Sequence, residues 1–224
     1  MDSQFPSSES NEESWMSVSD LMAGLMIVFL FVAITFVKAV GQEQEMLETK
    51  ICQDIKKALE EVSWREHVEI CGDQIVVKFK DPDTLFNLGK SDLKPRFKEI
   101  LTEFFPLYMG VIIRYRSEID ELRIEGHTDD IGPRGTALDK YFYNIGLSQE
   151  RTRSVMQFLF GTPVASKNEK WLIRHMTANG LSSSNPVFNP DNTLNRPSSR
   201  RVEFRLRLKT PKRLREIAEA FAWN

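Results

Sequence analysis

One acidic residue stands at the beginning of a long apolar run near the start of this 224-residue sequence. Asp20 precedes residues 21–37, LMAGLMIVFLFVAITFV, among which none is charged. An ionised carboxylate inside a membrane costs about 2.5–3.5 kcal/mol on insertion scales, so such a residue is a functional candidate by default. Because an apolar setting favours the neutral form, a carboxylate there can take up a proton and release it where water returns. Asp20 is therefore the candidate for ion translocation.

The depth of Asp20 in the membrane has two interpretations. Asp20 could lie at the interface as a helix-start residue beside Ser17 and Ser19. Trp15 favours the deeper position, because an interfacial tryptophan would place Asp20 about one and a half turns further inward.

Residues 15–40 are long enough to cross a bilayer, because roughly 23 residues at ~1.5 Å rise cover a hydrocarbon core of about 30 Å. A cleaved signal peptide would need a basic leader and a small-residue cleavage site. Instead, residues 1–14 carry only acidic charges, and residues 36–39 read FVKA. We therefore expect an uncleaved single-pass helix at 15–40 in the bacterial inner membrane, preceded by a disordered tail at 1–14.

Residues 41–63 are expected to form a stalk helix before a domain at 64–224. Its apolar residues recur every three or four positions, at Leu47, Ile51, Ile55, Leu59 and Val62. This stripe needs a partner, which is either the chain's own domain or a second copy of the helix. Cys52 and Cys71 are either a disulfide of an oxidising compartment or two reduced core residues.

Short strands and helices alternate through the rest of the chain. The pattern predicts a hairpin around Gly72-Asp73, a helix at 93–107, a strand at 122–125, a helix at 147–160 with Ser148 as its N-cap, a strand at 201–208 and a helix at 211–224. Residues 171–178 fit either a strand or a helix. The predicted fold class is an α/β (α+β) sandwich with helices on one face of a small sheet.

Four motifs of this region resemble the OmpA-type peptidoglycan-binding domain. They are LFNLGKSDLKP at 85–95, IEGHTDDIG at 124–132, NIGLSQERTRSV at 144–155 and SRRVEFRL at 199–206. All four occur in the family's order and at workable spacing. The resemblance implies an OmpA-like domain that binds the bacterial cell wall.

The resemblance also implies a ligand and a site. The stem peptide of the wall presents diaminopimelate, whose side chain carries an ammonium and a carboxylate on one carbon. By resemblance, Asp129 takes the ammonium, and Arg151 takes the carboxylate with its planar fork at a helix start. Thr128 and Asn144 would line or brace the pocket. The alternative for Asp129 and Arg151 is a structural salt bridge.

Two features depart from the family pattern. The segment at 133–143 is longer than the usual connection, so we expect it to add a flap or to alter access. Ser199 stands where the family has an asparagine that commonly braces the site, a change expected to affect ligand affinity rather than fold.

No catalytic group, metal site or cofactor motif is predicted. His127 has no Cys or Ser partner at triad spacing, and a lone histidine is more often a hydrogen-bonded structural residue. No spacing typical of metal ligands is visible, and a net charge of −2 gives no bias towards nucleic acid. A wall-cleaving enzyme is therefore the weakest hypothesis.

The whole arrangement resembles the MotB-like B subunit of the flagellar stator. The segment SDLMAGLMIVFLFV with its acidic leader and brief stalk is more similar to the B component of the Zorya phage-defence motor. That resemblance implies proton or sodium transfer through Asp20, a multi-helix A subunit forming a ring of five around two B chains, and a homodimer anchored to peptidoglycan. The alternatives are a flagellar stator B subunit and a passive membrane-to-wall anchor.

Orientation does not follow from the charges, because residues 1–14 contain no Lys or Arg and Lys38 lies beyond the apolar run. We expect the N-terminus in the cytoplasm and the C-terminal domain in the periplasm, because that is where its expected ligand lies.

Overall fold

The computed structural model describes residues 9–72, 74–80 and 85–210, and their side chains from residue 18 onward. The chain divides into two compact units, one of residues 1–46 and 211–224 and the other of residues 47–210. The helix predicted at 211–224 and Asp73 of the predicted hairpin lie outside the described residues.

The described part of the first unit is the beginning of helix α1 (Glu9–Ala58), which Gly41 does not interrupt. Residues 9–14, expected as disordered tail, are already helical. Among the described residues, one helix is long and apolar enough to cross a membrane; its mean hydropathy reaches 2.5, and none of its apolar window is buried by protein. Thr35 within it donates its hydroxyl to the carbonyls of Phe31 and Val32, at 3.0 and 2.9 Å, so this polar group needs no other partner.

The apolar stripe expected on a stalk belongs to the core of the second unit. The side chains of Ile51, Ile55 and Leu59 are fully buried, and they pack into the same cluster as the strands. The second compact unit begins at Leu47, within the residues predicted as the stalk. The stripe's partner is the chain's own domain, so these residues are not available for a coiled coil with a second copy.

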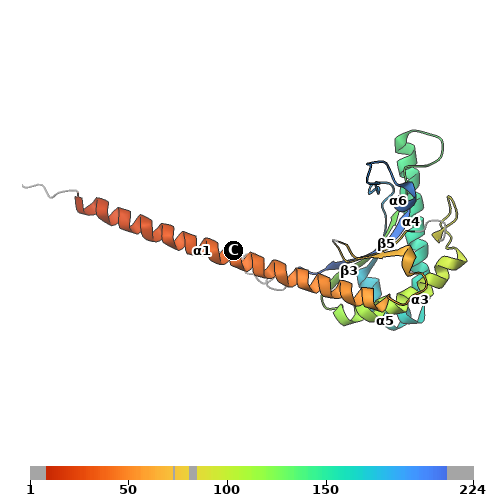
Figure 1. Cartoon of the computed structure of the whole chain (residues 1–224), viewed down its shortest axis with the longest axis horizontal. Coiled ribbons are helices and arrows are strands. Elements are labelled where there is room, and N and C mark those ends of the chain that lie inside the picture. The colour runs from red at the N-terminus through yellow and green to blue at the C-terminus, as the bar shows by residue number, and fades with distance from the viewer. Residues whose placement is uncertain (1–8, 73, 81–84, 211–224) are drawn as a thin grey trace, which may run out of the picture. The chain divides into compact units, whose positions relative to one another are not determined.

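A five-stranded sheet forms the centre of the second unit, with strand order β1-β2-β5-β3-β4. Figure 1 labels two of its strands, β3 and β5. The strands are β1 (Val68–Ile70), β2 (Val76–Phe79), β3 (Ile119–His127), β4 (Met176–Gly180) and β5 (Arg201–Leu208). β3 and β4 pair in parallel, and all other neighbours are antiparallel. The predicted hairpin and the strands predicted at 122–125 and 201–208 are confirmed.

The helices of this unit pack against one face of the sheet, as predicted. They are α3 (Pro95–Ile112), α4 (Ala137–Phe160) and α5 (Pro163–His175), with short turns η1 (Arg65–His67), η2 (Ile113–Tyr115) and α6 (Arg196–Ser199) between elements. Phe79, Phe104 and Phe204 meet edge to face between α3 and the sheet, with ring centroids 4.9–5.7 Å apart. This aromatic cluster forms the centre of the core.

Charged side chains cover the opposite face of the sheet, because alternate residues of β3 and β5 are acidic or basic. Arg205 donates to Glu125 on the neighbouring strand at 2.9 Å and to Glu203 at 2.6 Å, and Arg123 donates to Glu121 at 2.6 Å. We call these ion pairs across β3 and β5 the charged ladder. It accounts for the strict alternation at 201–208, in which apolar side chains face the core and charged side chains face the other side of the sheet.

The sequence left open whether residues 171–178 form a strand or a helix, and the structure contains both. α5 ends at His175, and β4 begins at Met176. Pro163 follows the N-cap Thr162, a position that suits proline because the first helical N–H has no intrahelical acceptor.

Helix α4 begins ten residues before the predicted start. Thr136 is its N-cap, and Thr136 and Asp139 form a capping box. Ser148 is therefore not an N-cap; it lies inside the helix, where its hydroxyl donates to the carbonyl of Asn144 at 2.7 Å. Arg151 lies in mid-helix rather than at a helix start. The expected flap at 133–143 is thus partly helical, since residues 137–143 are the first turns of α4.

Glycine lets α4 approach the sheet closely. A β-carbon on Gly126 of β3 would lie 2.7 Å from the carbonyl oxygen of Ser148 and 2.8 Å from a methyl carbon of Thr152. Only a residue without a side chain fits there. This contact sets the distance between the end of β3 and the middle of α4, where the predicted ligand-binding residues lie.

Candidate functional site

Asp129 lies just beyond the end of β3 and is 6% exposed. Its Oδ1 accepts a hydrogen bond from the backbone N–H of Ile131 at 3.0 Å, which fixes the turn after the strand. Its Oδ2 accepts from Arg200 at 2.8 Å. The carboxylate is thus held in place with one oxygen engaged by the backbone and the other by a cation.

Asn144 of α4 braces the loop that carries Asp129. It is 2% exposed, and its side-chain amide donates to the carbonyls of Asp129 at 3.1 Å and Ile131 at 2.9 Å. Thr128 is tied through its backbone N–H to Ser182. The Thr128 hydroxyl is buried, with no hydrogen-bond partner among the described residues. A buried hydroxyl without a partner is costly, so it is available to a ligand.

Arg151 reaches from α4 to the loop before α3. Its Nε donates to the carbonyl of Lys90 at 2.9 Å, and Nη2 donates to that of Asn87 at 3.3 Å. Its guanidinium carbon lies 4.8 Å from the ring centroid of Phe86, within the range of a cation–π contact. The structure therefore holds Arg151 by neutral groups and does not pair it with Asp129.

The charge of Arg151 is only partly compensated. Burial lowers the pKa of the Arg151 guanidinium; Tyr143 and Asp129 act in the opposite direction, and Arg200 adds to the lowering. An arginine side chain in a protein stays protonated even when burial lowers its pKa. Arg151 is thus a partly buried cation beside a second cation, and a carboxylate would be its natural partner.

All four residues predicted to bind the wall line one cavity of about 290 Å³. Its walls are Leu88, Gly89, Thr128, Asp129, Ile131, Gly132, Pro133, Tyr143, Asn144, Leu147, Arg151 and Arg200. The expected arrangement of one anion and one cation is present, with a second cation in addition. The expected alternative, an Asp129–Arg151 salt bridge, is not what the structure contains.

Arg200 is the charged residue of this cavity that the sequence did not suggest. It is the first arginine of the SRRVE segment, and its neighbour Arg201 instead enters the charged ladder through Glu203 at 2.6 Å. The alternation of β5 provides a weak signal, because consecutive residues point to opposite sides at the start of a strand. Buried Ser199 accepts from the N–H of Val187 and donates to the carbonyl of Asn195, so its hydroxyl braces the loop before β5.

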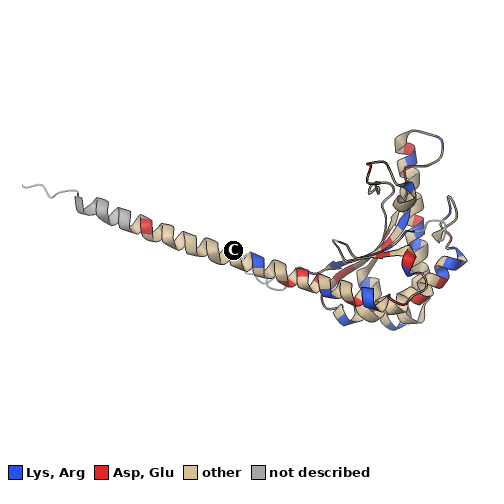
Figure 2. Cartoon of the chain, in the orientation of Figure 1, with Lys and Arg blue, Asp and Glu red and all other residues tan. Residues whose placement is uncertain are grey.

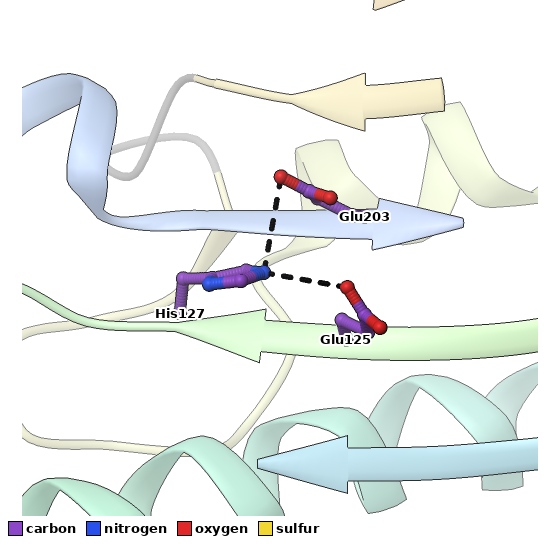
Figure 3. A group of neighbouring side chains, drawn as sticks. All are labelled: Glu125, His127 and Glu203. Carbon is purple, nitrogen blue, oxygen red and sulfur yellow. Dashed lines mark ion pairs between the residues drawn. The ribbon is translucent and has the colours of Figure 1, made fainter. Parts of the chain in front are cut away.

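His127 lies between two buried carboxylates (Figure 3). Its Nε2 is 3.8 Å from Glu125 and 3.8 Å from Glu203, and neither ring nitrogen has a hydrogen-bond partner among the described residues. Burial raises the pKa of Glu125, but His127 and Arg205 outweigh it and leave that pKa at about 2.

These three side chains lie close enough to suggest a metal site, but their surroundings do not fit one. Arg205 and Arg201 already donate to the two carboxylates at 2.9 and 2.6 Å. A divalent cation would add charge to carboxylates that guanidinium groups have neutralised, and the low dielectric of the interior magnifies that repulsion. The group is better explained as part of the charged ladder.

Asp20 lies in the first unit, at an exposed position on α1. In Figure 2, a long uncharged stretch of α1 follows the first position coloured red, and charged positions reappear towards the end of the helix. Among the residues whose side chains are described, none hydrogen-bonds the Asp20 carboxylate. From residue 18 to residue 37, Asp20 is the one ionisable side chain.

Comparison with known proteins identifies relatives along almost the whole chain. The sequence is 36% identical over 229 aligned residues to the Zorya protein ZorB of Escherichia coli strain ATCC 8739, covering 96% of this chain and 97% of that protein. The chain belongs to the ZorB family. A second ZorB, from Escherichia coli O139:H28, is 26% identical across 89% of this chain and 82% of its own length. No family model matches the sequence.

The fold of this ZorB-family chain has a counterpart among solved structures. A MotB-like protein from Desulfovibrio vulgaris superposes with a TM-score of 0.55 and 22% identity, covering 75% of this chain and 98% of that one. The OmpA- and MotB-like fold class is therefore confirmed. Within the described ranges, one apolar helix is long enough to span a membrane, which fits a single-pass membrane protein.

Proposed function

We propose that this chain is the peptidoglycan-anchored B subunit of an ion-driven rotary membrane motor that acts in anti-phage defence. The observation that carries the proposal is its relationship to a Zorya ZorB along 96% of its length, through both the apolar helix and the folded domain. None of these relatives is named as an enzyme, so the wall-cleaving hypothesis gains no support.

The proposed ion carrier is Asp20. Its position as the one ionisable side chain between residues 18 and 37 supports this role, because a carboxylate there has no fixed cation to neutralise it. Each charge that crosses a potential of about 100 mV releases about 2.3 kcal/mol. A single helix does not enclose an ion path, so the proposal includes a homodimer and an A subunit that forms a ring, with five A chains around two B chains.

The proposed wall contact is the cavity that holds Asp129, Arg151 and Arg200. These three ionisable groups sum to one net positive charge, which favours a ligand with an exposed carboxylate. A diaminopimelate carboxylate would lie against the guanidinium groups, and its ammonium would share Asp129 with Arg200. The free hydroxyl of Thr128 offers a further hydrogen bond.

The proposed orientation places residues 1–14 in the cytoplasm and the second unit in the periplasm. The disulfide between Cys52 and Cys71, whose Cα atoms are 6.0 Å apart, supports this orientation because structural disulfides persist in oxidising compartments.

The test is to express the chain with its genomic partner subunit and compare it with Asp20→Asn in the same host. Loss of phage protection, with swimming, membrane assembly and wall binding unchanged, is the expected result. Loss of swimming instead would identify a flagellar stator subunit. If neither phenotype changed, the motor function would be wrong and a passive anchor would take its place.

A further inference from the structure

Exposed aromatic side chains gather on the first turns of α4, next to the cavity of the proposed wall contact. Tyr141, Phe142 and Tyr143 are 37%, 63% and 43% exposed. The rings of Tyr141 and Phe142 meet edge to face, with centroids 6.0 Å apart. Clustered exposed apolar side chains on a folded domain usually mark a binding surface.

Two of these rings line an open depression of about 490 Å³ that continues from the cavity. Its lining residues are Gly89, Lys90, Ser91, Asp92, Phe142, Tyr143, Gly146, Leu147 and Glu150. Gly89, Tyr143 and Leu147 line both spaces, so a ligand can extend from one into the other without leaving the surface. Gly89 has φ +66°, and a β-carbon there would lie 3.4 Å from the Tyr143 hydroxyl. Glycine thus allows the loop to turn closely beneath Tyr143.

Hydrogen bonds fix the backbone that carries this aromatic surface. The capping box of Thr136 and Asp139 fixes the helix start, with the Asp139 carboxylate 2.7 Å from the Thr136 hydroxyl. Ser182 donates its hydroxyl to the carbonyl of Tyr141 at 2.9 Å, and Asn144 ties the next turn to the loop of Asp129. A surface ordered before binding costs less entropy when a ligand arrives.

The composition of the depression suits a carbohydrate. A pyranose ring has an apolar face of C–H groups, which packs on the electron-rich face of an aromatic ring, and a rim of hydroxyls. Asp92, Glu150 and Lys90 line the same depression and offer two acceptors and a donor for those hydroxyls. An apolar platform with a few polar groups at its edge is the usual composition of such sites.

We infer that the depression beside Phe142 binds a sugar of the wall glycan while the stem peptide of the same molecule occupies the cavity of Asp129 and Arg151. This inference rests on the proposed wall binding. In peptidoglycan, diaminopimelate is joined to the sugar through a short peptide, and each extended residue spans at most about 3.3–3.6 Å. A sugar covalently tethered to a bound stem peptide is therefore held near the neighbouring depression at high effective concentration.

The experiment compares two ligands on the full chain in detergent micelles by isothermal titration calorimetry. One ligand is the diaminopimelate-containing stem peptide alone, and the other is the same peptide carrying its N-acetylated disaccharide. We expect the sugar-bearing ligand to bind about three- to ten-fold more tightly to the wild type. Phe142→Ala should remove that advantage without changing affinity for the bare peptide, and Phe142→Trp should retain it.

Phe188→Ala is the matched control, because Phe188 is also an exposed aromatic residue, at 55%, but lines neither space. This variant should still bind the sugar-bearing peptide more tightly than the bare peptide, as the wild type does. Equal affinity of the wild type for both ligands would overturn the glycan contact and leave the proposed wall binding intact. Binding of neither ligand would overturn both. A change of oligomeric state in Phe142→Ala, with the sugar advantage kept, would assign the surface to a second copy of the chain and overturn the inference.

Discussion

The carboxylate of Asp129 accepts its ionic hydrogen bond from Arg200, at 2.8 Å, and not from Arg151. Arg151 is held instead by the carbonyls of Lys90 and Asn87. The two arginines therefore have different partners before any ligand binds. Among the described residues, Arg151 has no acidic partner in an ion pair, whereas Arg200 has one that an incoming ammonium would share.

Asp129→Asn should weaken binding of the diaminopimelate-containing stem peptide by about ten-fold to more than a hundred-fold. The asparagine oxygen can still accept from the N–H of Ile131, so the turn is kept, while the charge that holds the ammonium is lost. Asp130→Asn is the matched control, since the exposed Asp130 pairs with Arg196 and does not line the cavity. Calorimetry on the full chain measures both; equal losses in the two variants would argue against the site.

Arg200→Ala tests whether Arg200 binds the ligand or only shields Asp129. Losing a guanidinium–carboxylate contact costs about 1.5–3 kcal/mol, and releasing Asp129 from a partly exposed ion pair returns about 0–1 kcal/mol. The net loss of about 0.5–3 kcal/mol means that affinity for the stem peptide should fall by about two-fold to a hundred-fold or more. Arg196→Ala, which removes the exposed partner of Asp130, should leave it unchanged. Tighter binding in Arg200→Ala would mean that Arg200 acts only as a competitor.

The sequence motifs were sufficient to group Thr128, Asp129, Asn144 and Arg151 as one candidate site. In the structure these four residues line one cavity, because the end of β3 and the helix α4 packed against it place them together. They could not identify Arg200. Two adjacent arginines in SRRVE look alike in sequence. In the structure, Arg200, just before β5, reaches Asp129 in the cavity, whereas Arg201, the first residue of β5, reaches Glu203 in the charged ladder.

Two further differences between the prediction from sequence and the structure concern the start of α4 and the partner of the apolar stripe, and both have local physical causes. The stretch TALD at 136–139 caps α4 with an aspartate, whereas the usual capping box carries Glu or Gln, and the start of the helix was therefore predicted too late at Ser148. The stripe through Ile51 and Ile55 has the same period whether its partner is a second helix or the chain's own sheet. Periodicity predicts the helix but does not identify what covers it.

The disulfide between Cys52 and Cys71 closes a short loop between the end of α1 and the end of β1, at a sequence separation of 19. Replacing both cysteines by serine should lower stability by about 3 kcal/mol and the melting temperature of the second unit by roughly 6–12 °C. Thermal unfolding of the full chain, with and without a reducing agent, measures the effect. Reductant should shift the wild type and leave the double variant unchanged; an unshifted wild type would mean that the bond does not form.

The last prediction concerns the charged ladder and its dependence on pH. In the folded chain the pKa of Glu125 is lowered from 4.5 to about 2, despite the opposing effect of burial, because His127 and Arg205 favour its charged form. A lowered pKa means that the folded state holds the proton less tightly than the unfolded state does. The stabilisation from Glu125 is therefore fully present above about pH 4.5 and is lost as the pH falls towards 2.

The stabilisation from the ionised Glu125 is on the order of 3 kcal/mol, since each unit of difference in pKa between the folded and unfolded states corresponds to about 1.4 kcal/mol. Glu125→Gln keeps an oxygen that can accept from Arg205 but removes the titration. Urea unfolding of the full chain at pH 7 and pH 3 should therefore show a smaller acid-dependent loss in Glu125→Gln than in the wild type. Glu99→Gln on α3, whose Arg96 pair is exposed, should behave as the wild type does. If Glu125→Gln lost as much stability on acidification as the wild type, the ladder would draw no stability from the ionised Glu125.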